Sequence, residues 1–229
     1  MSKADYSRSF GYQPATFSSF ERTVKSSIDN FILDNKVIGS LEKRTLRIEN
    51  YHALLISIFH QVFNSSGSFA LAGSMCNPSQ IAAREYLFHH AEEEMTHWQW
   101  ILEDLKSTGY SGKDPRDLEP KIDTTAYLSY GYYLALKFPI GRLAMALVLE
   151  GISGSFGLKY GELVLQQLQL KKEQAKFYLA HGELDQGHQK DIFSILSHSK
   201  LNDDETGQLA QVAINTVTLY KRIYNSSIE

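Results

Sequence analysis

The chain has 229 residues, 43% of them hydrophobic, which is enough to bury a full core in a single domain. Lys and Arg total 23 against 26 Asp and Glu, and the net charge of -3 argues against nucleic acid or an anionic membrane surface as partner. A single cysteine, Cys76, excludes an intramolecular disulfide framework and a cysteine-based zinc finger. No stretch approaches the roughly 20 apolar residues of a membrane helix, and the N-terminus has no signal-peptide core. We therefore expect a soluble, cytoplasmic protein whose partner is a small molecule or another protein.

Apolar residues recur at three- and four-residue intervals, which predicts an all-α fold. Residues 1–17 form a loose N-terminal arm in this interpretation, and the helices that we expect after it span residues 18–34, 41–64, 79–107, 124–138, 139–168, 171–198 and 203–224. The composition of NSSGSFALAGSMCNPS, residues 64–79, and of residues 107–120 predicts loops. Three glycines in GISGSFG, residues 151–157, predict a kink or a close backbone approach inside a helix. The expected architecture is one helical domain over residues 1–229, a bundle of about seven helices.

Acidic and imidazole side chains occupy positions in two of these helices where an amphipathic pattern would place core residues. In HHAEEEMTHWQW, Glu94 and His97 are three residues apart and His90 lies seven residues before His97, so all three share a face. Glu150 follows seven residues without a charge in RLAMALVLE, and a buried carboxylate there requires neutralisation, a charged partner or a metal ion. Ordinary solvated surface would explain either pattern taken alone.

A third helix contains HGELDQGH, residues 181–188, in which His181, Asp185 and His188 lie at offsets of four and three. This spacing places the three side chains on one side of a helix. Helix caps, solvent-facing polar groups or a pH-sensitive pair would also produce it. Across the three helices the inventory is three imidazoles and three carboxylates, which suits iron or manganese rather than calcium: Glu94, His97, Glu150, His181, Asp185 and His188.

Four-helix di-iron proteins of the ferritin type use similar parts, a carboxylate from each of two helices and Glu-x-x-His from the other two. That interpretation requires a further acid from an early helix, for which Glu42 and Glu49 are candidates. It leaves His181 without a role, although His181 lies on the same face one turn before Asp185.

The order ExxH, then a lone glutamate in VLEG, then HxxxDxxH about 30 residues later resembles the heme-oxygenase-like di-iron oxidases and oxygenases, a family with the TenA type of fold that includes the chlamydial death-domain-associating protein. The resemblance covers about residues 85–198. It implies two iron ions held by three side chains each: Glu94, His97 and His181 for one, and Glu150, Asp185 and His188 for the other. Some members have a carboxylate about two turns before the ligand histidine, where this chain has His90. We interpret His90 as a partner of the ligands, with a substitute ligand and a mere neighbour as alternatives.

The resemblance also implies an enzyme that uses O2 as co-substrate, with an external electron donor and with manganese as an alternative metal. The expected reaction is oxidation of a small organic substrate by C–C cleavage or N-oxygenation. The pocket walls that we expect are the aromatic helix 124–138, the glycine segment 151–157 and the side chains of Phe59 and Phe63. Exposed aromatic helices favour a homodimer.

Alternatives to this function remain. One is a self-sacrificing aminobenzoate synthase-like protein that uses its own tyrosine, such as Tyr160, and the amine of Lys159; a surface position explains Lys159 equally simply. Another is a non-enzymatic interaction protein that retains the fold. Thiaminase-like chemistry would need Cys76 in the pocket, and heme degradation would need a proximal histidine, for which His52 is a poor candidate.

Overall fold

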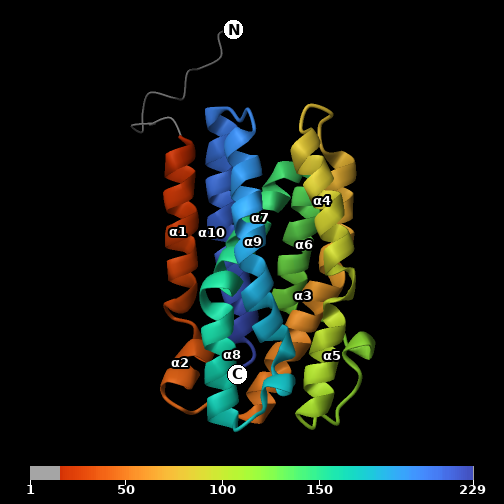
Figure 1. The fold of residues 1–229 in the computed structure, drawn as a ribbon, viewed down its shortest axis with the longest axis vertical. Helices are drawn as coiled ribbons and strands as arrows, with labels where there is room; N and C mark the ends of the chain where they lie inside the picture. The colour runs from red at the N-terminus through yellow and green to blue at the C-terminus, as the bar shows by residue number, and fades with distance from the viewer. Residues whose placement is uncertain (1–15, 229) are drawn as a thin grey trace.

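The computed structural model describes residues 16–228, except for the side chains of Glu183 and Gln186; residues 1–15 of the expected N-terminal arm lie outside this range. The described residues form helices joined by turns, without a strand, and the long helices run along the long axis of the molecule (Figure 1). This confirms the all-α prediction. The helices are α1 (Phe17–Ile32), α2 (Lys36–Glu42), α3 (Ile48–Met75), α4 (Ile81–Glu93), α5 (Trp98–Ser107), α6 (Ile122–Lys137), α7 (Pro139–Ile152), α8 (Leu158–Leu168), α9 (Lys176–His198) and α10 (Asp203–Asn225).

Two helices that we expected to be continuous are interrupted. A 3₁₀ turn at Glu94–Thr96 separates α4 from α5, and a π-helical turn at Ser153–Gly157 separates α7 from α8. The short helix α2 occupies part of the expected gap after the first helix. Because of these two interruptions and of α2, the described residues form ten α-helices where about seven were expected.

The prediction of a loop over residues 64–79 is wrong for most of that range, because α3 continues through it. The hydroxyl of Ser66 donates a hydrogen bond to the carbonyl of Ala91 in α4, at 2.7 Å. Gly73 lies against the ring of Phe88, where an added Cβ would come within 3.3 Å. Small side chains thus let α3 and α4 pack closely, and this packing outweighs the low helix propensity of serine and glycine.

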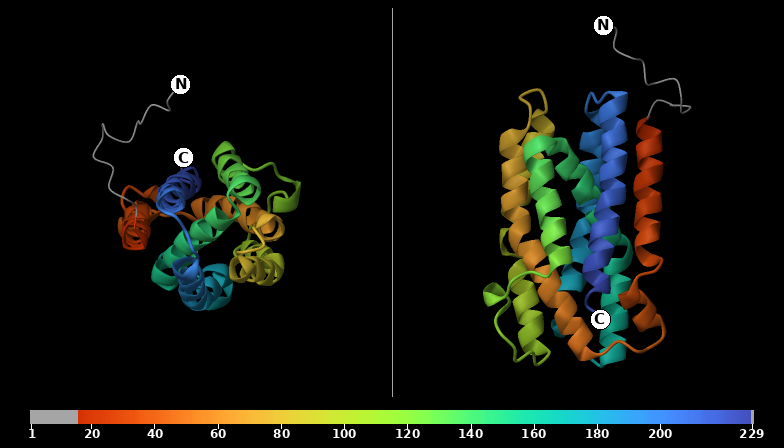
Figure 2. Two further views of the ribbon diagram at one scale, coloured as in Figure 1. Left: turned by 90° about the horizontal axis from the view of Figure 1, so that it is seen from above. Right: turned by 180° about the vertical axis from the view of Figure 1, so that it is seen from behind.

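Helix α7 lies inside the bundle, with α1 and α10 on one side and α3, α4 and α6 on the other (Figure 2). Every residue of α7 except Pro139 and Leu149 is buried. Glu150 is therefore a buried carboxylate among apolar helices, and the surface interpretation of its position is excluded. Such a group needs a charged or hydrogen-bonding partner nearby.

The glycine segment after Glu150 brings two backbones together, as expected. A Cβ on Gly157 would lie 3.1 Å from the Cα atom of Gly182, and a Cβ on Gly182 would lie 2.7 Å from the backbone nitrogen of Leu158. Real side chains do not tolerate the second distance, so the glycine is required at this contact. Helix α9 therefore lies directly against the end of the π-helical turn and the start of α8, and π-helical turns frequently mark functional sites.

The start of α9 is fixed by a side chain from α5. The carboxylate of Asp104 accepts hydrogen bonds from the backbone N–H groups of Lys176 and Phe177, at 2.9 Å each. These two N–H groups lack partners within their own helix, so Asp104 satisfies them and anchors α9 beside α5. Burial raises the pKa of Asp104 to about 6, although the two N–H groups oppose that shift.

Taken as one stretch, Pro139–Leu168 is long and apolar enough to span a membrane by length and composition alone. Because 72% of its most apolar window is buried inside the protein, the stretch fits the description of a core helix.

Candidate metal centre

The first cluster of metal-binding side chains joins the 3₁₀ turn after α4 to α9. Glu94, His97 and His181 are buried, and their ligand atoms lie within 4.8 Å of one another. Nδ1 of His97 lies 3.0 Å from Oε1 of Glu94, and the hydroxyl of Ser65 donates to Oε2 at 3.3 Å. The ring of Trp100 stacks on His97 with centroids 4.3 Å apart. Two imidazoles and one carboxylate thus converge in an aromatic surrounding.

The tautomer of His181 is set by the backbone. Its Nδ1 lies 3.0 Å from the carbonyl oxygen of Phe177, which can only accept, so Nδ1 carries the proton and Nε2 keeps its lone pair. Burial lowers the pKa of His181, against the opposing charge of Glu94, and keeps the ring neutral. A neutral imidazole oriented by a carbonyl through its other nitrogen is the usual form of a metal ligand.

Glu94 carries the negative charge of this cluster. Burial alone would raise the pKa of Glu94, but the hydrogen bond from His97 and the surrounding imidazoles outweigh burial and lower it. The carboxylate is therefore ionised at neutral pH, as a metal ligand requires.

The second cluster lies between α7 and α9 and consists of Glu150, Asp185 and His188, with ligand atoms again within 4.8 Å of one another. Nδ1 of His188 lies 3.5 Å from Oε2 of Glu150 and 3.8 Å from Oδ1 of Asp185. These separations exceed those of good hydrogen bonds. Oε2 of Glu150 and Nδ1 of His188 are buried and have no hydrogen-bond partner among the described residues.

The two carboxylates of the second cluster compete for one negative charge. Burial by itself would raise the pKa of Glu150, but the close imidazoles of His188 and His90 bring it far below its ordinary value. Burial and the negative charge of Glu150 raise the pKa of Asp185 far above its ordinary value. The nearby carboxylate of Glu150 raises the pKa of His188. A proton therefore stays on Asp185 unless a cation replaces it.

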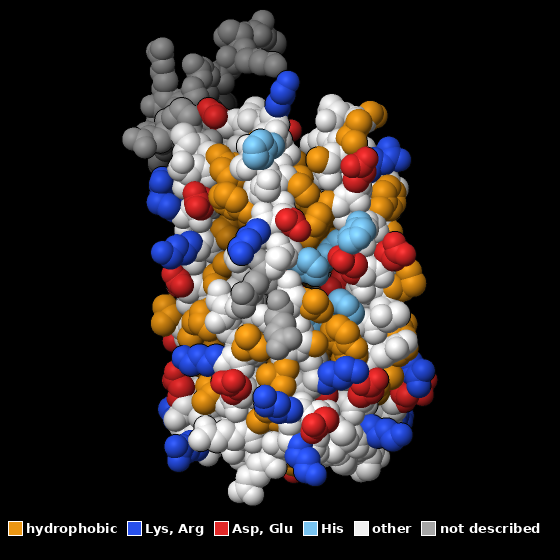
Figure 3. Space-filling view, viewed as in Figure 1, with side chains coloured by type: hydrophobic (Ala, Val, Ile, Leu, Met, Phe, Trp, Pro, Cys, Tyr) orange, Lys and Arg blue, Asp and Glu red, His pale blue; other side chains and the backbone are white. Residues whose placement is uncertain are grey.

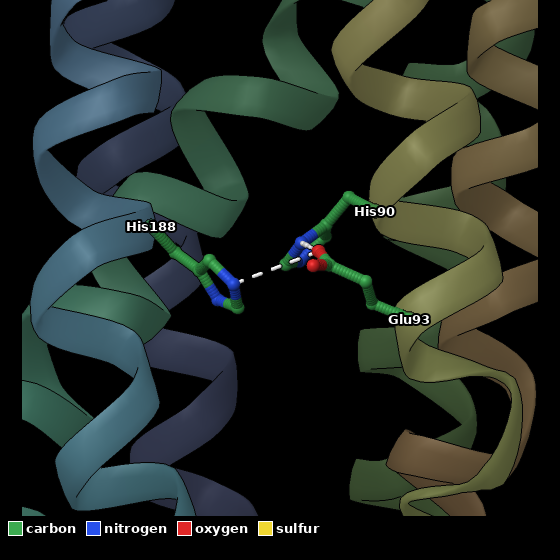
Figure 4. Close-up of side chains that lie close together, drawn as sticks. All are labelled: His90, Glu93 and His188. Carbon is green, nitrogen blue, oxygen red and sulfur yellow. Dashed lines mark ion pairs between the residues drawn. The ribbon is translucent and has the colours of Figure 1, made fainter.

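His90 and Glu93 lie beside this second cluster. Nε2 of His90 is 3.2 Å from Oε1 of Glu150, and the imidazole is fully buried between the rings of Phe69 and Tyr86. Glu93 faces both His90 and His188 (Figure 4). His90 thus contacts a predicted ligand directly, while the adjacent His89 is mostly exposed.

From outside, the clusters are reached on the face where α9 passes α4. Figure 3 shows pale-blue histidine side chains beside red acidic ones at this seam, with apolar side chains around them. The exposed fraction of the His188 side chain is 16%, whereas those of Glu94 and His97 are 10% each. The second cluster is therefore the more accessible of the two.

A cavity of about 70 Å³ joins the two clusters and is lined by Glu94 and His181 on one side and Glu150 and Asp185 on the other. The π-helical turn contributes to its wall, as expected, but no residue of α6 lines it, nor do Phe59 and Phe63. That part of the prediction is wrong, because Phe59 and Phe63 pack against Trp98 instead. Aromatic side chains from α1, α3, α9, α10 and the segment around the π-helical turn form part of the wall: Phe31, Phe69, Phe156, Tyr160, Phe177, Tyr178, Tyr220 and Tyr224.

The cavity wall also contains one cation that sequence reasoning missed. Arg142 is 2% exposed, its Nε donates to the hydroxyl of Ser68 at 3.1 Å, and its guanidinium lies 3.6 Å from the centroid of the Phe69 ring. Among the side chains that the structure describes, no carboxylate lies within ion-pair distance of it. The available signal was its position at the start of the apolar run that ends at Glu150.

Several residues named for alternative functions lie away from the cavity. Lys159 is exposed and does not line the cavity, whereas Tyr160 does. Cys76 is buried at the end of α3, and Nε2 of His52 bonds to the hydroxyl of Thr108 at 2.9 Å; neither lines the cavity. Glu42 and Glu49, the candidate acids for a ferritin-type site, are both exposed and outside the lining.

The donor set fits iron. A polyvalent cation would satisfy the buried donor atoms that have no partner and would neutralise the two neighbouring carboxylates. Three imidazoles and three carboxylates suit iron or manganese better than calcium, which takes oxygen ligands only.

Residues 53–221 match the model of a family described as iron-containing redox enzymes. The chain belongs to this family. The matched range contains every side chain of both clusters, and membership supports a redox role that involves iron. No curated protein matches the chain significantly.

Solved structures show that this family member has a heme-oxygenase-like fold. A domain of unknown function with that fold from Shewanella denitrificans OS217 aligns with a TM-score of 0.85 at 21% identity, over 93% of this chain and 92% of that one. A TenA homologue from P. horikoshii OT3 gives 0.70 at 18% identity, over 92% and 96%. Heme oxygenase-1 from Synechocystis sp. PCC6803, solved in complex with heme, gives 0.68 at 14% identity, over 92% and 90%. At these identities the likeness concerns the fold alone.

Proposed function

We propose that the protein is a non-heme di-iron oxidoreductase that uses O2 to oxidise a small organic substrate. One iron ion would bind to Glu94, His97 and His181, and the other to Glu150, Asp185 and His188. The single observation that supports this best is the convergence of two buried three-residue clusters on one cavity. Manganese in one or both positions is compatible with the same ligands.

The bound ions would supply electrons that reduce O2, while the substrate and an external donor supply the remaining electrons. The protein orients the ligands and excludes water. The Phe177 carbonyl holds His181 in one tautomer, Ser65 and His97 orient Glu94, and Trp100 covers the first cluster. Asp185 holds a proton that it must release when a cation binds.

The buried wall favours a small organic substrate. The aromatic lining excludes bulk water, and Arg142 gives one side of the cavity a positive charge. Oxidative C–C cleavage and N-oxygenation both suit such a cavity, and we propose reactions of this kind without choosing between them.

The competing functions have weaker support. A self-sacrificing aminobenzoate synthase-like reaction would need the amine of Lys159 at the cavity, and Lys159 is exposed elsewhere. Heme or thiaminase chemistry would need His52 or Cys76 there, and neither lines it. A non-enzymatic role would leave the unpartnered buried donors of the second cluster without an explanation.

His181→Ala tests the proposal, since it removes one ligand of the first ion from a site that is otherwise unchanged. The ferrous protein is mixed with O2 and its absorption is followed in a stopped-flow instrument. Wild type and His198→Ala, an exposed histidine of the same helix, should show an oxygen-dependent spectral change, and His181→Ala should not. Equal spectral changes in all three proteins would refute the assignment.

A further inference from the structure

Glu93 is the last residue of α4 and belongs to neither of the two inner clusters. Its Oε2 lies 3.5 Å from Nδ1 of His90 and 3.6 Å from Nε2 of His188. The three side chains form a third set of donors within 4.8 Å of one another. Figure 4 shows His90 and Glu93 of α4 facing His188 of α9 across the seam.

The separations in this third set fit a shared metal ion better than hydrogen bonds. Nitrogen and oxygen donors bound about 2.1 Å from a first-row ion at tetrahedral angles lie about 3.4 Å apart. Hydrogen bonds between nitrogen and oxygen are usually shorter, at about 2.7–3.2 Å. Nδ1 of His90 is buried and has no hydrogen-bond partner within the described part of the chain.

The two imidazoles form a wall between Glu93 and Glu150, and each presents one nitrogen to either side. His90 turns Nδ1 toward Glu93 and Nε2 toward Oε1 of Glu150, at 3.2 Å. His188 turns Nε2 toward Glu93 and Nδ1 toward Oε2 of Glu150, at 3.5 Å. The rings are nearly perpendicular, at 89°, with centroids 4.9 Å apart. An ion that leaves one set of nitrogens therefore meets the other nitrogens of the same two rings, while each ring moves its proton to the nitrogen that the ion has left.

Among the residues around the two histidines, Glu93 is the most exposed. The exposed fraction is 36% for the Glu93 side chain and 16% for that of His188, but 9% for Glu150 and 1% for His90. Glu93 is thus the carboxylate that an ion from solvent meets before it reaches Glu150. The inner cluster offers a bound ion two carboxylate ligands, where the outer set offers one.

We propose that Glu93, His90 and His188 form an entry site that captures a divalent metal ion and transfers it to the cluster of Glu150, Asp185 and His188. The transfer exchanges the Glu93 carboxylate for that of Glu150 and leaves the oxidation state of the ion unchanged. This inference rests on the proposed function, since it assumes that the inner cluster holds a metal ion.

The test compares Glu93→Gln with Glu92→Gln, which removes the preceding, exposed carboxylate. Metal-free proteins are mixed anaerobically with Co²⁺, and the growth of the visible absorption bands gives the rate of uptake. Final stoichiometry and affinity are measured by equilibrium titration with the same ion. Glu93→Gln should slow uptake by about tenfold or more, the lower end of the effect of charged groups at a cleft on association rates. It should leave the final number of ions and their affinity as in wild type, and Glu92→Gln should change neither.

Each other outcome overturns a specific statement. Uptake by Glu93→Gln at the wild-type rate would refute the entry site and leave the proposed function standing. Fewer ions or weaker equilibrium affinity in Glu93→Gln would show that Glu93 is a permanent ligand, which also refutes the entry role. If Glu92→Gln slowed uptake equally, the effect would come from general surface charge, and the entry site would be refuted. A wild-type protein that binds no Co²⁺ and no Fe²⁺ would refute the proposed function itself.

Discussion

Replacing Asp185 by asparagine should stabilise the metal-free protein and destabilise the metal-loaded one. In the metal-free state Asp185 is buried beside the ionised Glu150, and both facts raise the pKa of its carboxyl. Asparagine has nearly the same shape as aspartate. Its neutral amide can donate an N–H toward Glu150, and it does not need to bind a proton when the chain folds. The substitution therefore removes the electrostatic conflict of this cluster and, with it, one metal ligand.

The magnitude follows from the pKa of Asp185. Its ordinary value is 3.8, so at pH 7 the unfolded chain carries an ionised Asp185, whereas the folded chain keeps the proton. Each pH unit between 3.8 and 7 costs about 1.4 kcal/mol of folding free energy, which sets an upper limit of about 4 kcal/mol. Single stabilising substitutions in natural proteins commonly gain about 0.5–2 kcal/mol. We expect a gain of about 1–2 kcal/mol and a melting temperature higher by about 2–8 °C.

The direction of the Asp185 pKa shift determines how the stability difference between Asp185→Asn and wild type changes with pH. Because the pKa of Asp185 is raised on folding, its penalty is absent below about pH 4 and grows as the pH rises toward the folded value. The advantage of Asp185→Asn over wild type should therefore be near zero at pH 4 and largest at neutral pH and above. Urea denaturation after treatment with a chelator measures it.

Asp191→Asn serves as the control, because Asp191 is an exposed acid of the same helix. Its stability should differ from wild type by no more than about 0.5 kcal/mol. Added Fe²⁺ under anaerobic conditions should reverse the order, since wild type gains about 2.7 kcal/mol when the free ion is at a hundred times its dissociation constant. A metal-free Asp185→Asn protein that is less stable than wild type at pH 7, or equally favoured at pH 4 and pH 7, would refute the reasoning.

Two further predictions concern the supports of the site. Gly182→Ala should lower the free energy of unfolding by about 1–3 kcal/mol in denaturant titrations, because its Cβ would collide with the backbone nitrogen of Leu158. Gly39 lies in a helix with open space around it, so the control Gly39→Ala should instead raise the free energy of unfolding by up to about 1 kcal/mol. Equal effects of the two substitutions would contradict the close contact. Asp104→Ala should cost about 2–3 kcal/mol, since it leaves two N–H groups at the start of α9 without acceptors, and an unchanged unfolding midpoint would contradict this anchoring role.

Helical periodicity predicted most of the fold because burial in a bundle repeats every three to four residues. The same spacing identified His181, Asp185 and His188 as one face of a helix, and the structure brings them to the Glu94 and Glu150 positions expected from their own helices. What periodicity could not predict are features that depend on a neighbour. Helix α3 continues past residue 64 because its small residues pack against α4, a contact invisible in the local sequence.

The cavity wall was the least predictable part of the site. Tyr220 and Tyr224 come from α10, more than 30 residues after the last predicted ligand. Their spacing of four residues is typical of ordinary core positions in a helix. Glu93 was hidden for a different reason: in a run of three glutamates, only the fold distinguishes the exposed Glu92, the partly exposed Glu93 and the buried Glu94. The 3₁₀ turn that begins at Glu94 contributes to this difference by changing the helical register.

The most direct test of the central claim is the iron content of the chain after anaerobic loading with Fe²⁺ and removal of unbound metal. Two buried clusters predict about two iron ions per chain, falling to about one when His181 is replaced by alanine. A protein that retains no iron, with unchanged stability in its presence, would contradict the account.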